Sequence, residues 1–99
     1  MGLYIALQKE SCVVVEGVAD ESNLLHRVLP RGDGSLLSGI DWYGDTIFNG
    51  LQMKQFLTEW SQLEKTTGDP VELKLLATIQ QLASRCQNGT HLYLKFVGD

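Results

Sequence analysis

The chain has 99 residues, of which 43% are hydrophobic and 20% are charged. This balance is typical of a folded protein with one modest core, and it argues against intrinsic disorder. Twelve acidic residues outnumber eight basic ones, and the resulting net charge of −4 argues against a general nucleic-acid binder, which needs a basic surface. No apolar run approaches the roughly 20 residues of a membrane helix. We therefore expect one domain over residues 1–99, without nucleic-acid or membrane partners.

The N-terminal residues predict a strand and not a signal peptide. Leu3, Ile5 and Leu7 alternate with other side chains, and no basic segment precedes them. Cys12 and Cys86 are too few for a disulfide framework and lack the spacing of metal ligands. We therefore expect a cytoplasmic protein with two reduced thiols, no metal and no cofactor.

The first third of the chain predicts a hairpin followed by a short helix. Residues 12–16 are rich in β-branched side chains, and they favour an antiparallel hairpin with the first strand. Asp20 is a candidate cap for a helix over residues 21–29, which Pro30 would end. Residues 30–46 follow as an irregular, glycine-rich connection.

Two long amphipathic helices are predicted next. Asn49 and Gln52 form a capping box for a helix that continues to about Thr66. The run Gly68-Asp69-Pro70 separates it from a second helix that ends at Asn88-Gly89. The short connection predicts that the two helices pack antiparallel. The expected apolar face of the second helix consists of Val71, Leu75, Leu76, Ile79, Leu82, Ala83 and Cys86.

Residues 90–97 alternate again and predict a last strand. The elements together indicate an α+β fold. In this fold a three-stranded antiparallel sheet, made of the N-terminal hairpin plus the C-terminal strand, is covered on one face by the antiparallel helix pair, with one short extra helix. The first and last strands are both apolar, so we expect them to be adjacent and central.

The densest group of polar and aromatic side chains predicts a partner-binding site. It consists of Asp41, Trp42, Tyr43, Asp45 and Asn49. Loops on a rigid scaffold are common recognition sites, and aromatic rings supply contact area at low entropy cost. In the alternative interpretation, the two rings close the end of the core while a neighbouring polar side chain caps a helical turn.

A catalytic alternative would use Asp41 and Asp45 as acid and base, with His91 as proton carrier. Nothing in this spacing imposes the different environments that separate two pKa values, and the chain has no nucleophile motif. We therefore assign no catalytic residue. The alternative function is a small enzyme or ligand-binding protein with a pocket at the loop of residues 40–49.

The outward face of the sheet is a second candidate surface, with Tyr4, Ala6, Val14, Tyr93 and Lys95. If the helices cover only one face, this other face is aromatic and carries little charge. Such a face invites a partner protein or a second copy of the chain. A homo-oligomeric structural subunit is therefore the third functional hypothesis, with a homodimer through this face as its simplest form.

Two segments, IDWYGDTIFN at residues 40–49 and HLYLKF at residues 91–96, resemble a family of small uncharacterised bacterial proteins. This resemblance spans the chain and implies no activity. In size and acidity the chain is also similar to bacterial toxin-immunity proteins, without a shared motif, so no residue role is carried over. We expect a small acidic protein-binding module, in its most specific form an inhibitor or immunity-like protein that docks on a basic partner.

Overall fold

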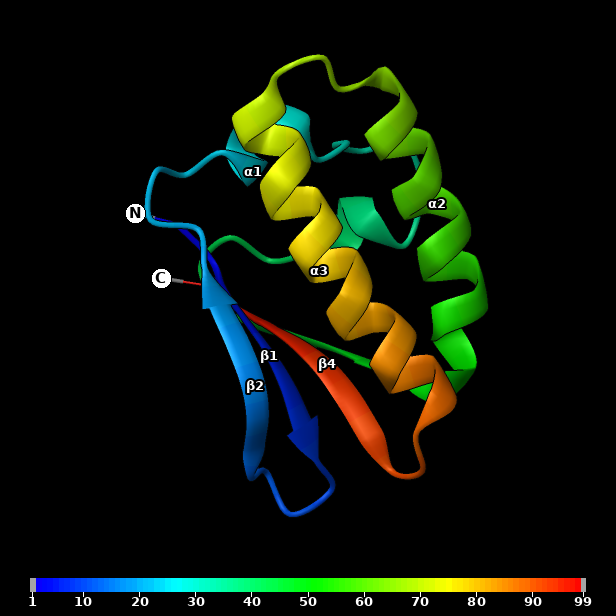
Figure 1. Cartoon of the computed structure of the whole chain (residues 1–99). Helices are drawn as coiled ribbons and strands as arrows, with labels where there is room; N and C mark the ends of the chain where they lie inside the picture. The colour runs from blue at the N-terminus through cyan, green and yellow to red at the C-terminus, as the bar shows by residue number, and fades with distance from the viewer. Residues whose placement is uncertain (1, 99) are drawn as a thin grey trace.

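The fold has two layers, a four-stranded antiparallel sheet and a pair of long helices (Figure 1). The computed structural model describes residues 2–98. The strands are β1 (Tyr4–Lys9), β2 (Val14–Ala19), β3 (Asp45–Asn49) and β4 (Leu92–Val97). Their order in the sheet is β2-β1-β4-β3. The expectation that the first and last strands are adjacent and central is therefore confirmed.

The prediction of three strands was wrong. Residues 45–49, expected to lie in a loop and at a helix start, form β3, which pairs antiparallel with β4 at the edge of the sheet. Phe48 is buried and Ile47 is exposed, so this strand has the alternation of a half-buried strand. The alternation is short, and it is bounded by Asp45 and Asn49, which are residue types uncommon in strands.

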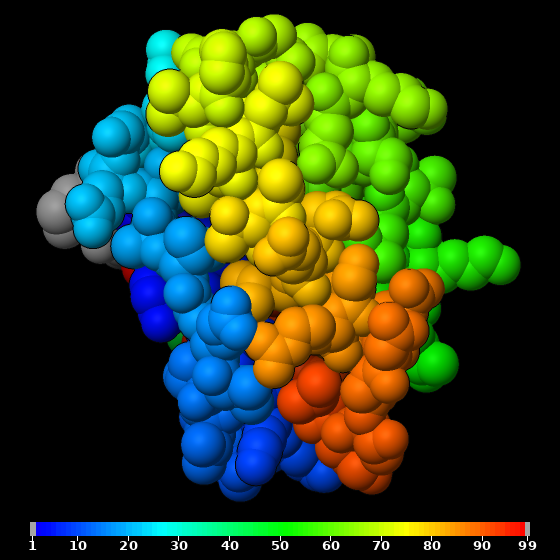
Figure 2. Space-filling model, viewed as in Figure 1, coloured from blue at the N-terminus to red at the C-terminus, as the bar shows by residue number. Residues whose placement is uncertain are grey.

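The two long helices, α2 (Met53–Thr66) and α3 (Pro70–Asn88), pack against one face of the sheet (Figures 1 and 2). The predicted capping box is confirmed, because the side chains of Asn49 and Gln52 each accept the other's backbone N–H. It opens a 3₁₀ turn, η2 (Gly50–Gln52), that leads into α2. Within the described residues, no helix combines the length and the apolar run that crossing a bilayer requires.

Aromatic rings join the two layers at the centre of the core. Phe56 and Trp60 of α2 stack with their ring centroids 5.2 Å apart, and both rings contact Phe96 of β4. Phe48 of β3 meets Phe56 at 5.3 Å and Phe96 at 5.9 Å. The indole N–H of Trp60 donates to the Leu76 carbonyl of α3 at 2.9 Å. This cluster therefore connects both long helices to the neighbouring strands β3 and β4.

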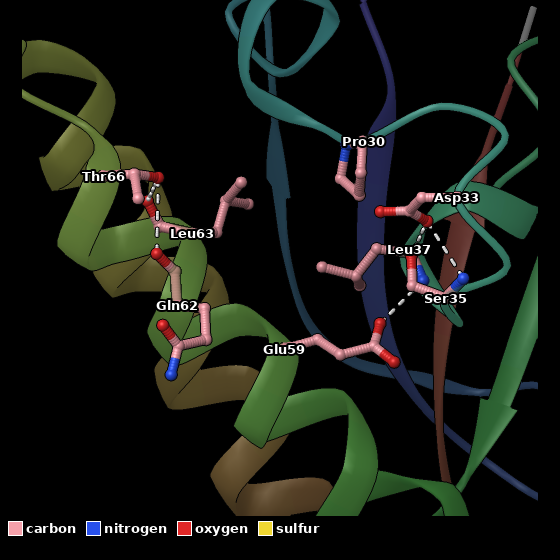
Figure 3. A pocket seen from close by; sticks show the side chains of 8 residues that line it. All are labelled: Pro30, Asp33, Ser35, Leu37, Glu59, Gln62, Leu63 and Thr66. Carbon is pink, nitrogen blue, oxygen red and sulfur yellow. Dashed lines mark hydrogen bonds between the residues drawn. The ribbon is translucent and has the colours of Figure 1, made fainter.

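The irregular segment after the short helix α1 (Leu25–Val28) is tied to α2 by a carboxylate. Glu59 accepts hydrogen bonds from the backbone N–H groups of Leu36 and Leu37, at 3.1 Å each, and Figure 3 shows the one from Leu37. These N–H groups open a 3₁₀ turn, η1 (Leu37–Gly39), and would otherwise lack an acceptor. A side chain of α2 therefore fixes the connection that the sequence predicted only as irregular.

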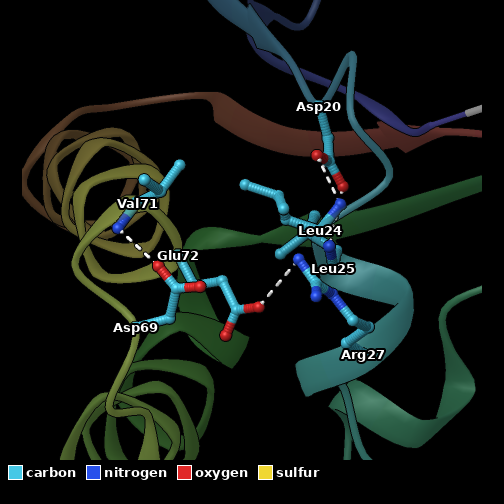
Figure 4. Close-up of polar contacts among 7 residues, drawn as sticks. All are labelled: Asp20, Leu24, Leu25, Arg27, Asp69, Val71 and Glu72. Carbon is cyan, nitrogen blue, oxygen red and sulfur yellow. Dashed lines mark hydrogen bonds and ion pairs between the residues drawn. The ribbon is translucent and has the colours of Figure 1, made fainter.

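The start of α3 faces α1 (Leu25–Val28), and this overturns one expected core position. Val71, predicted to lie on the apolar face, is 64% exposed. Glu72 lies buried instead, and its carboxylate is 3.1 Å from the guanidinium of Arg27 (Figure 4). The first turn of α3 extends beyond the sheet, so its contact surface is α1 and not the strands.

The short helix is shorter than the predicted 21–29. Asn23 has a positive φ of 55°, which interrupts helical geometry, so α1 begins only at Leu25. Asp20 still has the expected capping role, because its carboxylate accepts the backbone N–H groups of Leu24 and Leu25 at 2.8 Å each (Figure 4). The Asp20 side chain is only 2% exposed.

Replacing Asp20 by Ala should therefore destabilise the fold. The change leaves two N–H groups without their acceptor, and we expect the free energy of unfolding to fall by about 1–2 kcal/mol in urea denaturation. The neighbouring acid Glu21 is exposed, and Glu21→Ala serves as the matched control, with an effect within about 0.5 kcal/mol. Equal stability of the two variants would contradict the capping role.

The two cysteines should differ sharply in reactivity. Cys12 is exposed in the hairpin turn, whereas Cys86 is buried and its thiol lies 3.4 Å from the Leu92 carbonyl. Burial raises the pKa of the Cys86 thiol, which disfavours the reactive thiolate. We expect iodoacetamide at pH 8 to label only Cys12 in the native protein and both thiols in denaturant, as read by peptide mass spectrometry. Native labelling of Cys86 at the rate of Cys12 would refute this.

Candidate functional site

The predicted site begins in a tight turn at one end of the sheet. The backbone N–H of Gly98, just after β4, donates to the carbonyl of Gly44 at 2.7 Å. A Cβ at Gly98 would lie only 2.6 Å from the carbonyl oxygens of Trp42 and Gly44, so the close approach needs a glycine. The turn of residues 41–44 is therefore held against the end of β4.

The carboxylate of Asp41 shapes this turn. One of its oxygens accepts the backbone N–H of Tyr43 at 2.8 Å, which is an Asx turn. The backbone N–H of Asp41 in turn donates to the hydroxyl of Thr46 at 2.9 Å. The other carboxylate oxygen lies where a Cβ at Gly44 would approach it to 2.8 Å. Asp41 thus has a local structural role and remains exposed.

The two adjacent rings of the predicted site have different environments. Trp42 is partly buried against the core, where His26 meets it edge-on at 5.3 Å and the Arg31 guanidinium lies 5.7 Å from its ring centroid. Tyr43 is 84% exposed. The core-closing interpretation therefore fits Trp42, while Tyr43 presents its ring to solvent.

The other two predicted residues have partners within the chain. The carboxylate of Asp45 lies 3.3 Å from the ammonium of Lys95 on the neighbouring strand. Asn49 caps the turn that leads into α2, through Gln52. Of the five predicted residues, Asp41 and Tyr43 are thus the two that the turn presents outward without an ion pair or a core contact among residues 2–98.

The structure separates the residues of the catalytic alternative. Asp45 pairs across the strands with Val97 at one end of β4, whereas His91 precedes the opposite end, about 20 Å away for six extended residues. His91 lies instead 3.4 Å from the carboxylate of Glu10. Neither Asp41 nor Asp45 is among the residues that line four of the surface cavities in the described part of the chain, whereas Asn49 and His91 line one of them together.

Strand register defines the outward face of the sheet, opposite the helices. This face has three cross-strand rows. Starting at the end of the sheet next to the turn, they are Ala19, Tyr4, Val97 and Asp45; then Gly17, Ala6, Lys95 and Ile47; then Val14, Gln8, Tyr93 and Asn49. Asp45 and Lys95 are the two charged positions among these twelve, and they pair with each other. The outward face is therefore electrically neutral, in a chain whose net charge is −4.

This outward face also presents apolar and aromatic side chains to solvent. Ile47 is 52% exposed, and Tyr4 and Val14 are exposed as well. Tyr4 lies across Gly17, since a Cβ added at Gly17 would collide with the tyrosine ring and hydroxyl. Ile47 was missed in the sequence because β3 was not predicted, although its alternation with Phe48 was the available signal.

No family model, no curated protein and no solved structure matches this chain. The comparisons therefore supply no relative from which a residue role could be transferred. Among residues 2–98, no group of three His, Cys, Asp or Glu side chains is placed to hold a metal ion.

The two rings of the turn should respond differently to truncation. Trp42→Ala removes a ring packed against the core, so we expect the free energy of unfolding to fall by about 2–3 kcal/mol. Tyr43→Ala removes an exposed ring and should change it by less than about 0.5 kcal/mol. Urea denaturation of both variants measures the difference. A loss of stability in Tyr43→Ala as large as that in Trp42→Ala would show that both rings close the core.

Proposed function

We propose that this protein is a small protein-binding module. Its contact region is the turn-and-sheet surface, defined by Asp41, Tyr43, Tyr4, Ile47 and Tyr93. The observation that carries the proposal is the 84% exposure of Tyr43 at the tip of a tight turn beside an uncovered, neutral sheet face. Tyrosines are enriched at protein interfaces, and charged residues are depleted at interface centres.

The distribution of charge limits how this surface attracts a partner. Asp45 is already paired with Lys95, so Asp41 is the acid of the turn that has no ion pair within residues 2–98. The net charge of −4 would raise the association rate of a basic partner, while the tyrosine rings and Ile47 would supply the contact area. In its more specific form, the proposal is an inhibitor or immunity-like protein that docks on a basic partner.

The compartment that fits this proposal is the cytoplasm. Cys12 and Cys86 are both free thiols, one exposed and one buried. Unpaired thiols are typical of reducing compartments. The enzyme alternative has less support, because its acid and base candidates, Asp41 and Asp45, do not line the cavity that Asn49 and His91 share. The homodimer alternative would use the same turn-and-sheet surface in a second copy.

Affinity capture from source-cell lysate tests the proposal. The baits are the wild type, Tyr43→Ala, and Val71→Ala, which truncates an exposed apolar side chain on α3, away from the surface. We expect the wild type and Val71→Ala to retain one protein in stoichiometric amount. Tyr43→Ala should lose it, since removing an anchor ring costs about 2 kcal/mol or more of binding free energy. Asp41→Asn should weaken capture more at low salt than at moderate salt.

Three outcomes would overturn the heterologous-partner proposal. Capture that is unchanged by Tyr43→Ala would place the contact elsewhere on the molecule. An empty capture at both salts, together with a dimer in sedimentation velocity that Tyr43→Ala or Ile47→Asp dissociates, would assign the surface to a second copy of the chain. An empty capture with a monomer would reject the binding-module function itself.

A further inference from the structure

A groove separates the segment of residues 30–37 from α2, and it encloses about 290 Å³ (Figure 3). Its walls are apolar and come from Pro30, Leu37 and Leu63. Two carboxylates, Asp33 and Glu59, stand on the same side of this space. The groove therefore combines an apolar interior with a strongly anionic border.

Three consecutive backbone amides, those of Ser35, Leu36 and Leu37, donate hydrogen bonds to the two carboxylates. Asp33 accepts the backbone N–H of Ser35 at 3.0 Å and its hydroxyl at 2.6 Å. Glu59 accepts the N–H groups of Leu36 and Leu37 at 3.1 Å each. The hydroxyl of Ser35, with its N–H, lowers the pKa of Asp33, because both hydrogen bonds favour the ionised carboxylate.

The negative charge of this border has no cation opposite it in residues 2–98. The ion pairs of these residues join Arg27 to Glu72, Arg85 to Glu16, His91 to Glu10, and Lys95 to Asp45. Arg31 is close in sequence, but its guanidinium donates to the His26 carbonyl at 3.1 Å and lies over the Trp42 ring. The nearest basic residue along the chain is therefore held by other groups.

We propose that this groove receives an arginine side chain of a protein partner. The aliphatic stem would lie against Pro30, Leu37 and Leu63, with the guanidinium at Asp33 and Glu59. Arginine fits because its stem packs on apolar surface while its five N–H donors suit carboxylates in a fixed fork. The volume is at the lower limit of small-molecule pockets, about 300 Å³, which suits one side chain better than a larger ligand.

This inference deepens the proposed function, since it gives the chemistry of one contact that a basic partner would make. The groove and the turn-and-sheet surface are nevertheless separate sets of residues, so each can be tested alone. A small arginine probe needs neither Tyr43 nor the sheet face. Its binding therefore reports on the groove and not on the rest of the interface.

The test is an NMR titration of the ¹⁵N-labelled full chain with N-acetyl-arginine amide. We expect saturable shifts of the backbone amides of residues 33–37 and 62–66. N-acetyl-citrulline amide has the same shape without the charge, and its affinity should be lower by a factor of about ten or more. Equal binding of the citrulline probe, shifts confined to other residues, or no saturable shift at all would overturn the proposal. Equal binding of N-acetyl-lysine amide would overturn the assignment to arginine.

Matched variants separate the groove from general acidity. Asp33→Asn retains an acceptor for Ser35 and removes one charge. It should therefore weaken the binding of the arginine probe several-fold, while the NMR spectrum remains that of a folded protein. Glu21→Gln removes a charge from an exposed acid outside the groove, and it should leave the affinity unchanged. Equal losses of affinity in both variants would show that the effect comes from net charge alone, and they would refute the proposed arginine site in the groove. If the probe fails while capture still depends on Tyr43, the groove proposal alone falls.

Discussion

The ring cluster of Phe48, Phe56, Trp60 and Phe96 is the interaction on which the remaining structure depends. It places α2 over β3 and β4, and the Trp60 indole bonded to the Leu76 carbonyl brings α3 alongside. Both long helices are thereby committed to one face of the sheet. The other face is left to its own side chains, and its neutrality and exposed rings are the reason for treating it as a contact surface.

Many of the acidic side chains make hydrogen bonds or ion pairs within the fold. Asp20 caps α1, Glu72 pairs with Arg27, Glu59 holds η1, and Asp45 pairs with Lys95. A net charge of −4 therefore does not translate into an acidic docking face at the predicted site. Exposed acids without an ion pair among residues 2–98 include Asp41, Asp33 at the groove and Glu21, so the charge that would steer a partner is spread over several parts of the surface.

Local patterns predicted much of the fold, because they depend on residues close in sequence. The hairpin, the capping box at Asn49, the helix pair and the central position of the first and last strands follow from periodicity and caps. The missed strand β3 is defined by its partner β4, more than 40 residues further along the chain. Val71 was misplaced because a helical wheel assumes one burying surface, whereas the start of α3 meets α1. The different environments of Trp42 and Tyr43 depend on Arg31 and His26, which sequence patterns do not bring together.

The contact of Trp42 with Arg31 links the two proposed surfaces. Arg31 is two residues from Asp33, and a free guanidinium there would neutralise the border of the groove. The Trp42 ring and the His26 carbonyl hold it away, so the groove stays anionic because the neighbouring turn is folded. The same ring anchors the turn that presents Tyr43. One partly buried tryptophan would thus support both proposed contacts, the aromatic one of the turn and the charged one of the groove, both of which draw on residues 30–44.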